Sequence, residues 1–446
     1  MGGLAFNACV PPVVVPRMPR DIYAKVLDQT LMLLKKHYKF CASPTEGPGK
    51  ATFGDIDILV ASPLSEAYDP FLQDKPIFTK RVAEHLKGLL GSDLFIATPG
   101  NPTINFAIPW PNEESQSTGQ DKFIQLDVHH LPSKERFDWE LFHSAHSDLW
   151  NILGSTIRPF GLTANDTGLY LRITEIETLD KKKSLVYLTS SPKDVLDFLG
   201  LDHSMWWNEF KSEDEMFRYA AKNRMFWVRE EDESLGEGDV VVKGESELLA
   251  QEGGDAGKKK LKHNDRQRMA KRPIFRAWIN DFIPVLRKEG GPRAPTVTRE
   301  QVRDEALEKF GVREIYETRL KEWQLARHLE ELKRDIIKGE IPLVENIPVP
   351  DGASFRSAAV RMLTDVIMGG EKFDGKSPPA ARKTEQGFYD IELVRDFVRK
   401  NWRRAGELGL ERQRARANEA MKAKGEKKRK DAEELEQQVD VDITSG

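Results

Sequence analysis

The stretch Gly54-Asp55-Ile56-Asp57-Ile58-Leu59-Val60 decides the fold that the sequence predicts. Acidic and apolar residues first alternate and then run apolar, as expected of a buried strand. Because strand residues two apart point to the same face, we expect the carboxylates of Asp55 and Asp57 side by side. Two anions held this close repel each other unless a cation joins them, and hard oxygen ligands suit Mg²⁺. The stretch therefore predicts a metal-binding strand.

A third carboxylate, Asp127, lies in another strand-like stretch, residues 123–128. If the two strands are neighbours, Asp55, Asp57 and Asp127 form a two-metal site for Mg²⁺ or Mn²⁺. In such a site one ion lowers the pKa of an attacking hydroxyl, while the other holds a triphosphate and steadies the leaving pyrophosphate. The three carboxylates thus predict nucleotidyl transfer.

The segments around these strands alternate between helical and strand-like patterns. Apolar residues at helical spacing predict a helix over 21–38 with Asp21 as its N-cap, and a second helix over 75–90. Further strands are expected over 94–97 and 103–109. The order predicts an α+β fold, with a small mixed sheet and flanking helices.

Beyond residue 130 the pattern becomes mainly helical, with a strand-like stretch at 185–188. Ser191 followed by Pro192 predicts the start of a helix. A group of aromatic residues follows at helical spacing, which favours a place in the core over the stacking of bases. These residues are Trp206, Trp207, Phe210, Phe217, Tyr219, Phe226 and Trp227.

Charge is strongly segregated along this chain of 446 residues, although the formal net charge is only −4. Residues 229–257 carry ten acidic and two basic groups, which indicates a solvated linker. The last forty residues lack an apolar stripe, and we expect a lone solvated helix or disorder. The predicted organisation is a disordered N-terminus (1–19), an α+β domain with a helical end (20–228), a low-complexity linker (229–262), a helical region (263–408) and a charged tail (409–446).

The acidic motifs resemble those of the nucleotidyltransferase superfamily, and most closely the palm and part of the thumb of the family X DNA polymerases. The stretches His146-Ser147-Asp148-Leu149-Trp150-Asn151, 158–171 and 194–201 resemble segments that follow the palm in that family. The sequence departs from the family's pattern at Ala42-Ser43, where the family has Gly-Ser, at Gln125, where it has Arg, and at His146, where it has Gly.

The resemblance implies a role for each matching residue. Asp55 and Asp57 would bind both metal ions, and Asp127 would bind the catalytic ion and help to activate the 3′-hydroxyl. The remaining residues would hold the nucleotide, with the sugar and base at Asp148 and Asn151 and the triphosphate near Ser43, Lys50, Thr52 and Gly54.

The expected function is therefore a metal-dependent nucleotidyltransferase that moves a nucleotide from a nucleoside triphosphate to a hydroxyl, such as a nucleic-acid 3′ end. One alternative is a scaffold or binding protein that keeps the fold without catalysis. Another is a transferase that acts on RNA or on a protein hydroxyl. A glycosyltransferase is the weakest alternative, because that chemistry gives no reason for Asp127. Adjacent strand residues face opposite sides, so at most one of His129 and His130 could reach the metal site, and a place at the surface or in the core is favoured for them.

Two basic segments predict a nucleic-acid partner. Residues 258–276 carry nine basic groups against one acidic, and residues 409–430 carry nine against three. The run at 427–430 is equally compatible with a nuclear localisation signal and with a solvated helix. The sequence has two cysteines, no apolar run of membrane-spanning length and no leader pattern. These features favour an intracellular location, with the nucleus ahead of the cytoplasm, and they predict no membrane partner.

Overall fold

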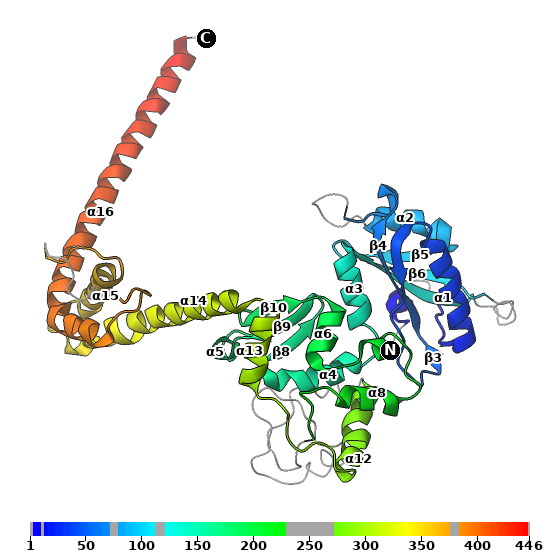
Figure 1. Ribbon diagram of the computed structural model, residues 1–446. Coiled ribbons are helices and arrows are strands. Elements are labelled where there is room, and N and C mark those ends of the chain that lie inside the picture. The colour runs from blue at the N-terminus through cyan, green and yellow to red at the C-terminus, as the bar shows by residue number, and fades with distance from the viewer. Residues whose placement is uncertain are drawn as a thin grey trace, which may run out of the picture. The chain divides into compact units, whose positions relative to one another are not determined.

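The fold was analysed in a computed structural model that describes residues 3–9, 13–71, 79–111, 121–228, 272–374 and 383–444. The chain divides into two compact units, Met1–Tyr316 and Glu317–Gly446, and each is described by itself. The first unit is a mixed α+β structure and the second is helical (Figure 1). This confirms the predicted fold class at the level of a mixed sheet followed by a helical C-terminal region. The predicted domain limits fall partly outside the described residues and stay predictions.

The first unit is built on a mixed sheet of five strands in the order β2-β4-β7-β6-β5. The two central strands, β4 and β7, run parallel, and every other pair in this sheet is antiparallel. The strand expected over 94–97 and the one over 103–109 are confirmed. The five strands are β2 (Tyr38–Ala42), β4 (Asp55–Pro63), β5 (Leu94–Ala97), β6 (Thr103–Pro109) and β7 (Phe123–Leu131).

Alternation along β4 assigns its residues to two different faces of the sheet. Ile56, Ile58 and Val60 pack in a large apolar core with residues of α1 (Arg20–Leu34) and α2 (Thr79–Leu90). Leu59 and Ala61 pack on the opposite face against Phe137 of α3 (Lys134–His143). Asp55 and Asp57 share the second face, because they are four and two residues from Leu59. The core on one side thus fixes which side presents the acidic residues.

Two local predictions near this sheet were wrong. The helix expected over 21–38 ends at Leu34, and Tyr38 instead begins strand β2, which had been missed. The N-cap is Pro19 and not Asp21, and no side chain caps this helix. A short pairing of β1 (Met18–Pro19) with β3 (Thr52–Phe53) fixes the chain just before the helix, so no side-chain cap is needed to set its start.

A small antiparallel sheet, β10-β9-β8, and several helices complete the first unit. Ser191 accepts a hydrogen bond from the backbone N–H of Asp194, which confirms it as the predicted N-cap. Most of the aromatic group is buried, as expected, but Trp207 is 37% exposed. The elements are β8 (Leu162–Asn165), β9 (Gly168–Arg172), β10 (Leu185–Thr189), α4 (Leu149–Ile157), α5 (Thr174–Glu177), α6 (Pro192–Leu199), α7 (His203–Trp206), α8 (Glu213–Ala221), α11 (Pro273–Ala277), α12 (Ile283–Lys288) and α13 (Arg299–Lys309), with short helical turns η1 (Ala5–Ala8), η2 (Glu66–Tyr68), η4 (Arg158–Phe160) and η5 (Trp278–Phe282).

The second unit is held together by the packing of α15 (Gly352–Met368) against α16 (Ile391–Thr444). Two glycines of α16 make this approach possible. A Cβ on Gly406 would lie 2.2 Å from the ring of Phe355, and one on Gly409 would lie 2.6 Å from the carbonyl oxygen of Ala358. The unit also contains α14 (Arg313–Glu331), which begins just before the division, and the turns η6 (Leu332–Ile337) and η7 (Val344–Asn346).

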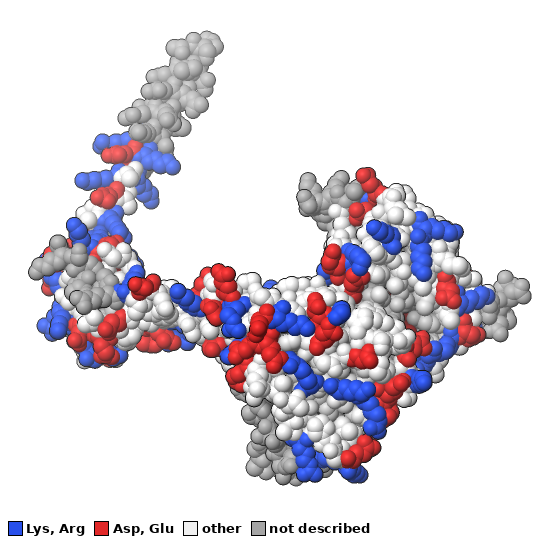
Figure 2. Space-filling model, viewed as in Figure 1, with Lys and Arg blue, Asp and Glu red and all other residues white. Residues whose placement is uncertain are grey.

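The C-terminal part of α16 is a helix whose described side chains are exposed from residue 415 to residue 427. Figure 2 shows Lys and Arg side chains along the described part of this helix, with acidic side chains between them. Of the two outcomes expected for the tail, the structure therefore has the helix. Among the described residues, no helix combines the length and apolar character that crossing a membrane requires.

Candidate metal centre

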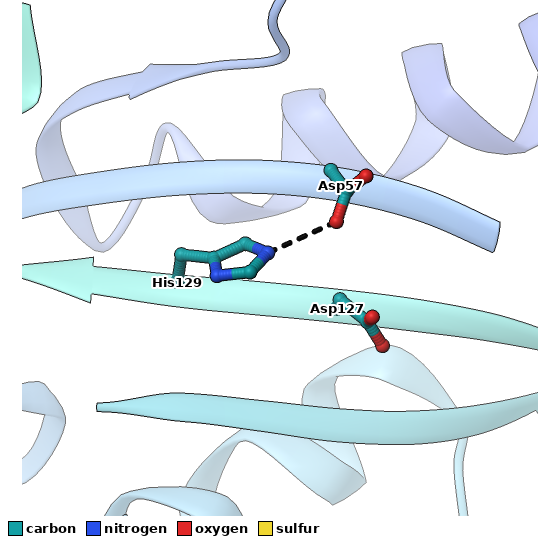
Figure 3. A group of neighbouring side chains, drawn as sticks. All are labelled: Asp57, Asp127 and His129. Carbon is teal, nitrogen blue, oxygen red and sulfur yellow. Dashed lines mark hydrogen bonds and ion pairs between the residues drawn. The ribbon is translucent and has the colours of Figure 1, made fainter. Parts of the chain in front are cut away.

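Three metal-ligating side chains converge on the acidic face of the sheet. Asp57 on β4 lies directly opposite Asp127 on β7 in the parallel register, and His129 follows Asp127 on the same face. One ligand atom from each of the three residues lies within 4.8 Å of the other two (Figure 3). Two carboxylates and one imidazole at this separation are a set of groups that could hold one metal ion.

Neighbouring side chains orient the ligands. Asn105 of β6, the register partner of Asp127, donates to Asp127 Oδ1 at 2.7 Å. Gln125 donates to both oxygens of Asp127 at 3.0 Å. Thr103, the register partner of His129, places its hydroxyl 2.9 Å from His129 Nδ1. Such outer hydrogen bonds fix the orientation of a ligand and the tautomer of a histidine.

The electrostatics of the centre favour a cation. Burial, with a smaller effect of the Asp57 charge, raises the pKa of Asp127 to about 6, although hydrogen bonds from Asn105 and Gln125 oppose the shift. His129 Nε2 lies 2.9 Å from Asp57 Oδ1. Burial lowers the pKa of His129, but the hydrogen bond and charge of Asp57 outweigh it, so the net pKa is raised. The hydrogen bond that His129 donates to Asp57 thus partly offsets the negative charge that a metal ion would neutralise.

Exposure differs sharply between the two carboxylates. Asp127 is 8% exposed, whereas 49% of the Asp57 side chain is exposed. One ligand is therefore held in the fold and the other stands at the surface, which gives an ion a path to the centre.

Asp55 lies on the same face but outside this group, and its expected role in binding both ions stays a prediction. Its Oδ2 accepts a hydrogen bond of 3.3 Å from the backbone N–H of Gly3. Burial and the charge of Asp57 raise the pKa of Asp55, and the Gly3 hydrogen bond opposes that rise. Gly3 has φ +78°, and a Cβ there would lie 2.5 Å from the carbonyl oxygen of Gly54. The N-terminal segment therefore packs closely over this end of β4.

A polar cavity of about 240 Å³ adjoins the centre and is lined by Asp57 and His129 together with Ser43 and Lys50. Ser43 and Lys50 come from the loop between β2 and β3, and the fold brings them next to Asp57 of β4 and His129 of β7. Lys50 is not an unpaired cation, because its Nζ lies 2.8 Å from Glu46 Oε2. Ser43 and Lys50 are thus next to the metal group, as the predicted grouping requires, while their binding role stays a prediction.

The other predicted nucleotide-binding residues do not line this cavity. Thr52 is exposed and accepts a 2.9 Å hydrogen bond from Arg17. Asp148 Oδ1 lies 2.6 Å from Arg272 Nη1, and Asn151 makes a long hydrogen bond of 3.4 Å to the same carboxylate. Gly54 is covered by Gly3. Each of these residues therefore has a partner of its own within the fold.

His129 is the residue that sequence reasoning placed wrongly. The sequence predicted a surface or core place for both histidines, and His130 does lie in the core, with its Nε2 2.9 Å from the hydroxyl of Tyr38. His129 belongs to the metal group. The sequence feature that could have placed His129 is its spacing from Asp127, because residues two apart on a strand lie on the same face of the sheet.

The comparisons with known proteins overturn the expected nucleotidyltransferase membership. No family model matches the chain. The chain is similar to a ferrochelatase from Thermoplasma acidophilum, with 25% identity over 169 residues that cover 35% of this chain and 50% of that protein. This chain thus spans half the length of the ferrochelatase that it matches. The expected superfamily, the nucleotidyl transfer and the polymerase-type enzyme class are corrected on this finding.

The physical reason for the error lies in what a carboxylate pattern can specify. Acidic residues two apart on a strand, with a third on a neighbouring strand, define a place for a cation. They do not define the reaction that the cation serves, because the same ligands suit several metals and many chemistries. The two-metal interpretation of the carboxylates and the family resemblance both suggested nucleotidyl transfer, but the ligand types alone do not specify a reaction.

Proposed function

We propose that this chain binds one divalent metal ion through Asp57, Asp127 and His129 and has a function of the metal-chelatase type. The observation that carries the proposal is the convergence of three ligand atoms within 4.8 Å on two neighbouring strands. Their outer hydrogen bonds to Asn105 and Thr103 are of the kind that metal centres use to hold their ligands in place.

The ligand set favours a transition metal over Mg²⁺. Carboxylates suit Mg²⁺ and Mn²⁺, whereas an imidazole suits iron, zinc, copper and nickel. A centre with both types of ligand fits Fe²⁺ or Zn²⁺ best, with Mn²⁺ next. The match to a protein named ferrochelatase supports Fe²⁺ within this group. The Mg²⁺ expected from the carboxylates alone becomes the competing outcome.

Three protein ligands leave at least one coordination position open, which is the arrangement of a centre that exchanges or uses its ion. The exposed Asp57 and the adjoining polar cavity give that open position a route to solvent. These features support capture and release of an ion in preference to permanent structural binding.

The test is isothermal titration calorimetry of the full chain. The metal ions are Fe²⁺, titrated in the absence of oxygen, and Zn²⁺, Mn²⁺ and Mg²⁺. We expect one ion per chain, with Fe²⁺ or Zn²⁺ tighter than Mg²⁺. Asp127→Asn and His129→Gln should each weaken Fe²⁺ binding beyond the roughly 10–100-fold that loss of an outer hydrogen bond costs. Asp28→Asn, an exposed carboxylate on α1, is the matched control and should leave binding unchanged. Unaltered binding in His129→Gln, or tighter binding of Mg²⁺ than Fe²⁺, would refute the proposal.

A separate proposal concerns the predicted nucleic-acid partner. Most of residues 258–276 lie outside the described residues, but residues 409–430 lie on α16, and their described side chains are exposed from residue 413 to residue 427. A basic helix standing in solvent supports binding to phosphate backbones. Binding of a labelled duplex should fall steeply between 50 and 200 mM salt, and neutralising the basic residues of 409–430 should remove it. Nucleoside triphosphate as a partner stays a prediction.

A further inference from the structure

A cavity of about 570 Å³ in the helical second unit lies outside everything assigned above. It is formed by one face of α15, by Lys333 on η6, and by Lys338 and Val344 in the connection that follows (α15 in Figure 1). Its size is within the 300–1,000 Å³ typical of sites for small molecules.

The charges at this cavity are unbalanced. Lys333, Lys338 and Arg361 line it, and among the described residues none of their side chains pairs with a carboxylate. The acidic residue of the lining, Asp365, is itself paired, with its Oδ2 3.7 Å from Arg412 Nη1. Three cations without partners around one concave surface form a local excess of positive charge that attracts an anion.

The remaining wall of the cavity is apolar. Val344 lines it and is 46% exposed, and Val360 and Ala353 line it from α15. Exposed apolar side chains within a cavity gain free energy when an apolar group covers them. The ligand that this surface fits therefore carries both negative charge and an apolar body.

The shape of the cavity is fixed by a fourth basic residue, Arg356. Its Nε donates to the carbonyl oxygen of Pro342 at 2.9 Å, and its Nη2 donates to that of Lys338 at 2.8 Å. These bonds tie the connection between η6 and α15 to the helix. Arg356 is thus a positioning residue, and the three unpaired side chains are left to contact a ligand.

We propose that this cavity binds a small molecule in which a phosphate group is attached to an apolar or aromatic body. A phosphate carries more charge than a carboxylate and presents three terminal oxygens, so it matches three cations better. The aliphatic stems of Lys and Arg extend the apolar wall while their charged ends meet the phosphate.

The experiment compares four probes on the full chain by calorimetry: phenyl phosphate, inorganic phosphate, phenol and benzoate. Phenyl phosphate should bind at least about tenfold more tightly than each of the other three probes. It alone carries both a phosphate that can contact the three cations and a ring that can cover the apolar wall. If benzoate binds as well as phenyl phosphate, the ligand class is wrong. If inorganic phosphate equals phenyl phosphate, the apolar wall has no role and the proposal fails.

Variants locate the binding. The double variant Lys338→Gln and Arg361→Gln should weaken phenyl phosphate at least about tenfold, since charged hydrogen bonds to phosphate are among the strong ones. Lys400→Gln, an exposed lysine of the same unit, is the matched control and should change nothing. Ser357→Glu, which places an anion inside the cavity from an exposed helical position, should abolish binding as an independent check.

The proposal does not depend on the metal centre. The double variant should therefore bind Fe²⁺ as the unaltered chain does, and it should unfold at the same urea concentration. Phenyl phosphate binding that survives both the double variant and Ser357→Glu would overturn the assignment.

Discussion

Asp57 and Asp127 lie opposite each other in the parallel register of β4 and β7. The Asp57 side chain is 49% exposed, whereas Asp127 is 8% exposed. Two carboxylates in this position repel each other, and the repulsion adds to the effect of burial on the pKa of Asp127. The fold tolerates the pair because His129, Asn105 and Gln125 supply positive charge or hydrogen bonds. A metal ion would replace the hydrogen bond between His129 and Asp57 and remove the repulsion, and this links metal binding to stability.

Metal binding should therefore stabilise the folded chain. At a free ion concentration 100 times the dissociation constant, the free energy of unfolding should rise by about 2.7 kcal/mol. Urea unfolding with Fe²⁺, compared with unfolding in the presence of a chelator, measures this gain. The same comparison on Asp127→Asn should give no gain. An equal gain in that variant would mean that the ion binds elsewhere.

Thr103 is predicted to orient His129 through its hydroxyl, which lies 2.9 Å from Nδ1. Thr103→Val keeps the shape of the side chain but removes this hydrogen bond, so metal affinity should fall about 10–100-fold. Thr103→Ser keeps the hydroxyl and should restore most of the affinity. If the valine and serine variants bind the metal equally well, the hydroxyl has no orienting role.

His130 should make stability fall as the solution is acidified. Its burial lowers its pKa from 6.5 to about 4. The folded state therefore binds fewer protons than the unfolded state between these values, and stability is lost as the pH drops from about 6.5 toward 4, by at most about 1.4 kcal/mol per pH unit. The pKa of Asp127, raised to about 6, has the opposite effect over much of this range.

A comparison of two proteins separates these opposing effects. His130→Gln removes the histidine titration together with the contacts of the ring to Tyr38 and Pro102. Loss of the contacts lowers stability at every pH, whereas loss of the titration should make stability relative to the unaltered chain improve as the pH falls from 7 to 5. Urea unfolding of both proteins at several pH values gives the difference in free energy. A difference that does not change with pH would contradict the assignment.

The packing of α15 against α16 should depend on Gly406. A Cβ there would lie 2.2 Å from the ring of the buried Phe355. Gly406→Ala should destabilise the second unit by about 1–3 kcal/mol through overpacking, despite the better helix propensity of Ala. Gly425→Ala on the same helix is the control, because a Cβ at Gly425 meets nothing within 4 Å. It should be neutral or stabilise by up to about 1 kcal/mol in thermal unfolding. Equal effects of the two substitutions would refute the packing argument.

The main strands of the sheet could be predicted from the sequence because their patterns are local. Alternation placed Asp57 on a strand face, and the predicted strand after residue 122 placed Asp127. Strand β2 was missed because its alternation covers only Tyr38, Lys39 and Phe40, and because Tyr38 also fits the spacing of the preceding helix. Its place depends on pairing with β4, which is a tertiary effect.

The composition of the metal group could be predicted only in part. The pairing of Asp57 with Asp127 follows from two strands being neighbours, but the hydrogen bond of Asp55 comes from Gly3, 52 residues away. No local pattern reports such a contact. The spacing of His129 from Asp127 was visible, and an imidazole ligand changes the expected metal from Mg²⁺ to a transition metal. The reaction was inferred from the three carboxylates and from a family resemblance, and the comparison with a ferrochelatase corrected it.

The most direct measurement is anomalous X-ray diffraction at the iron edge from crystals of the full chain grown with Fe²⁺ in the absence of oxygen. We expect one anomalous peak about 2.1 Å from His129 Nε2 and from one oxygen each of Asp57 and Asp127. The hydrogen bond between His129 and Asp57 should then be absent. A peak at other residues, or no peak at a concentration that saturates the titration, would contradict the proposed metal centre.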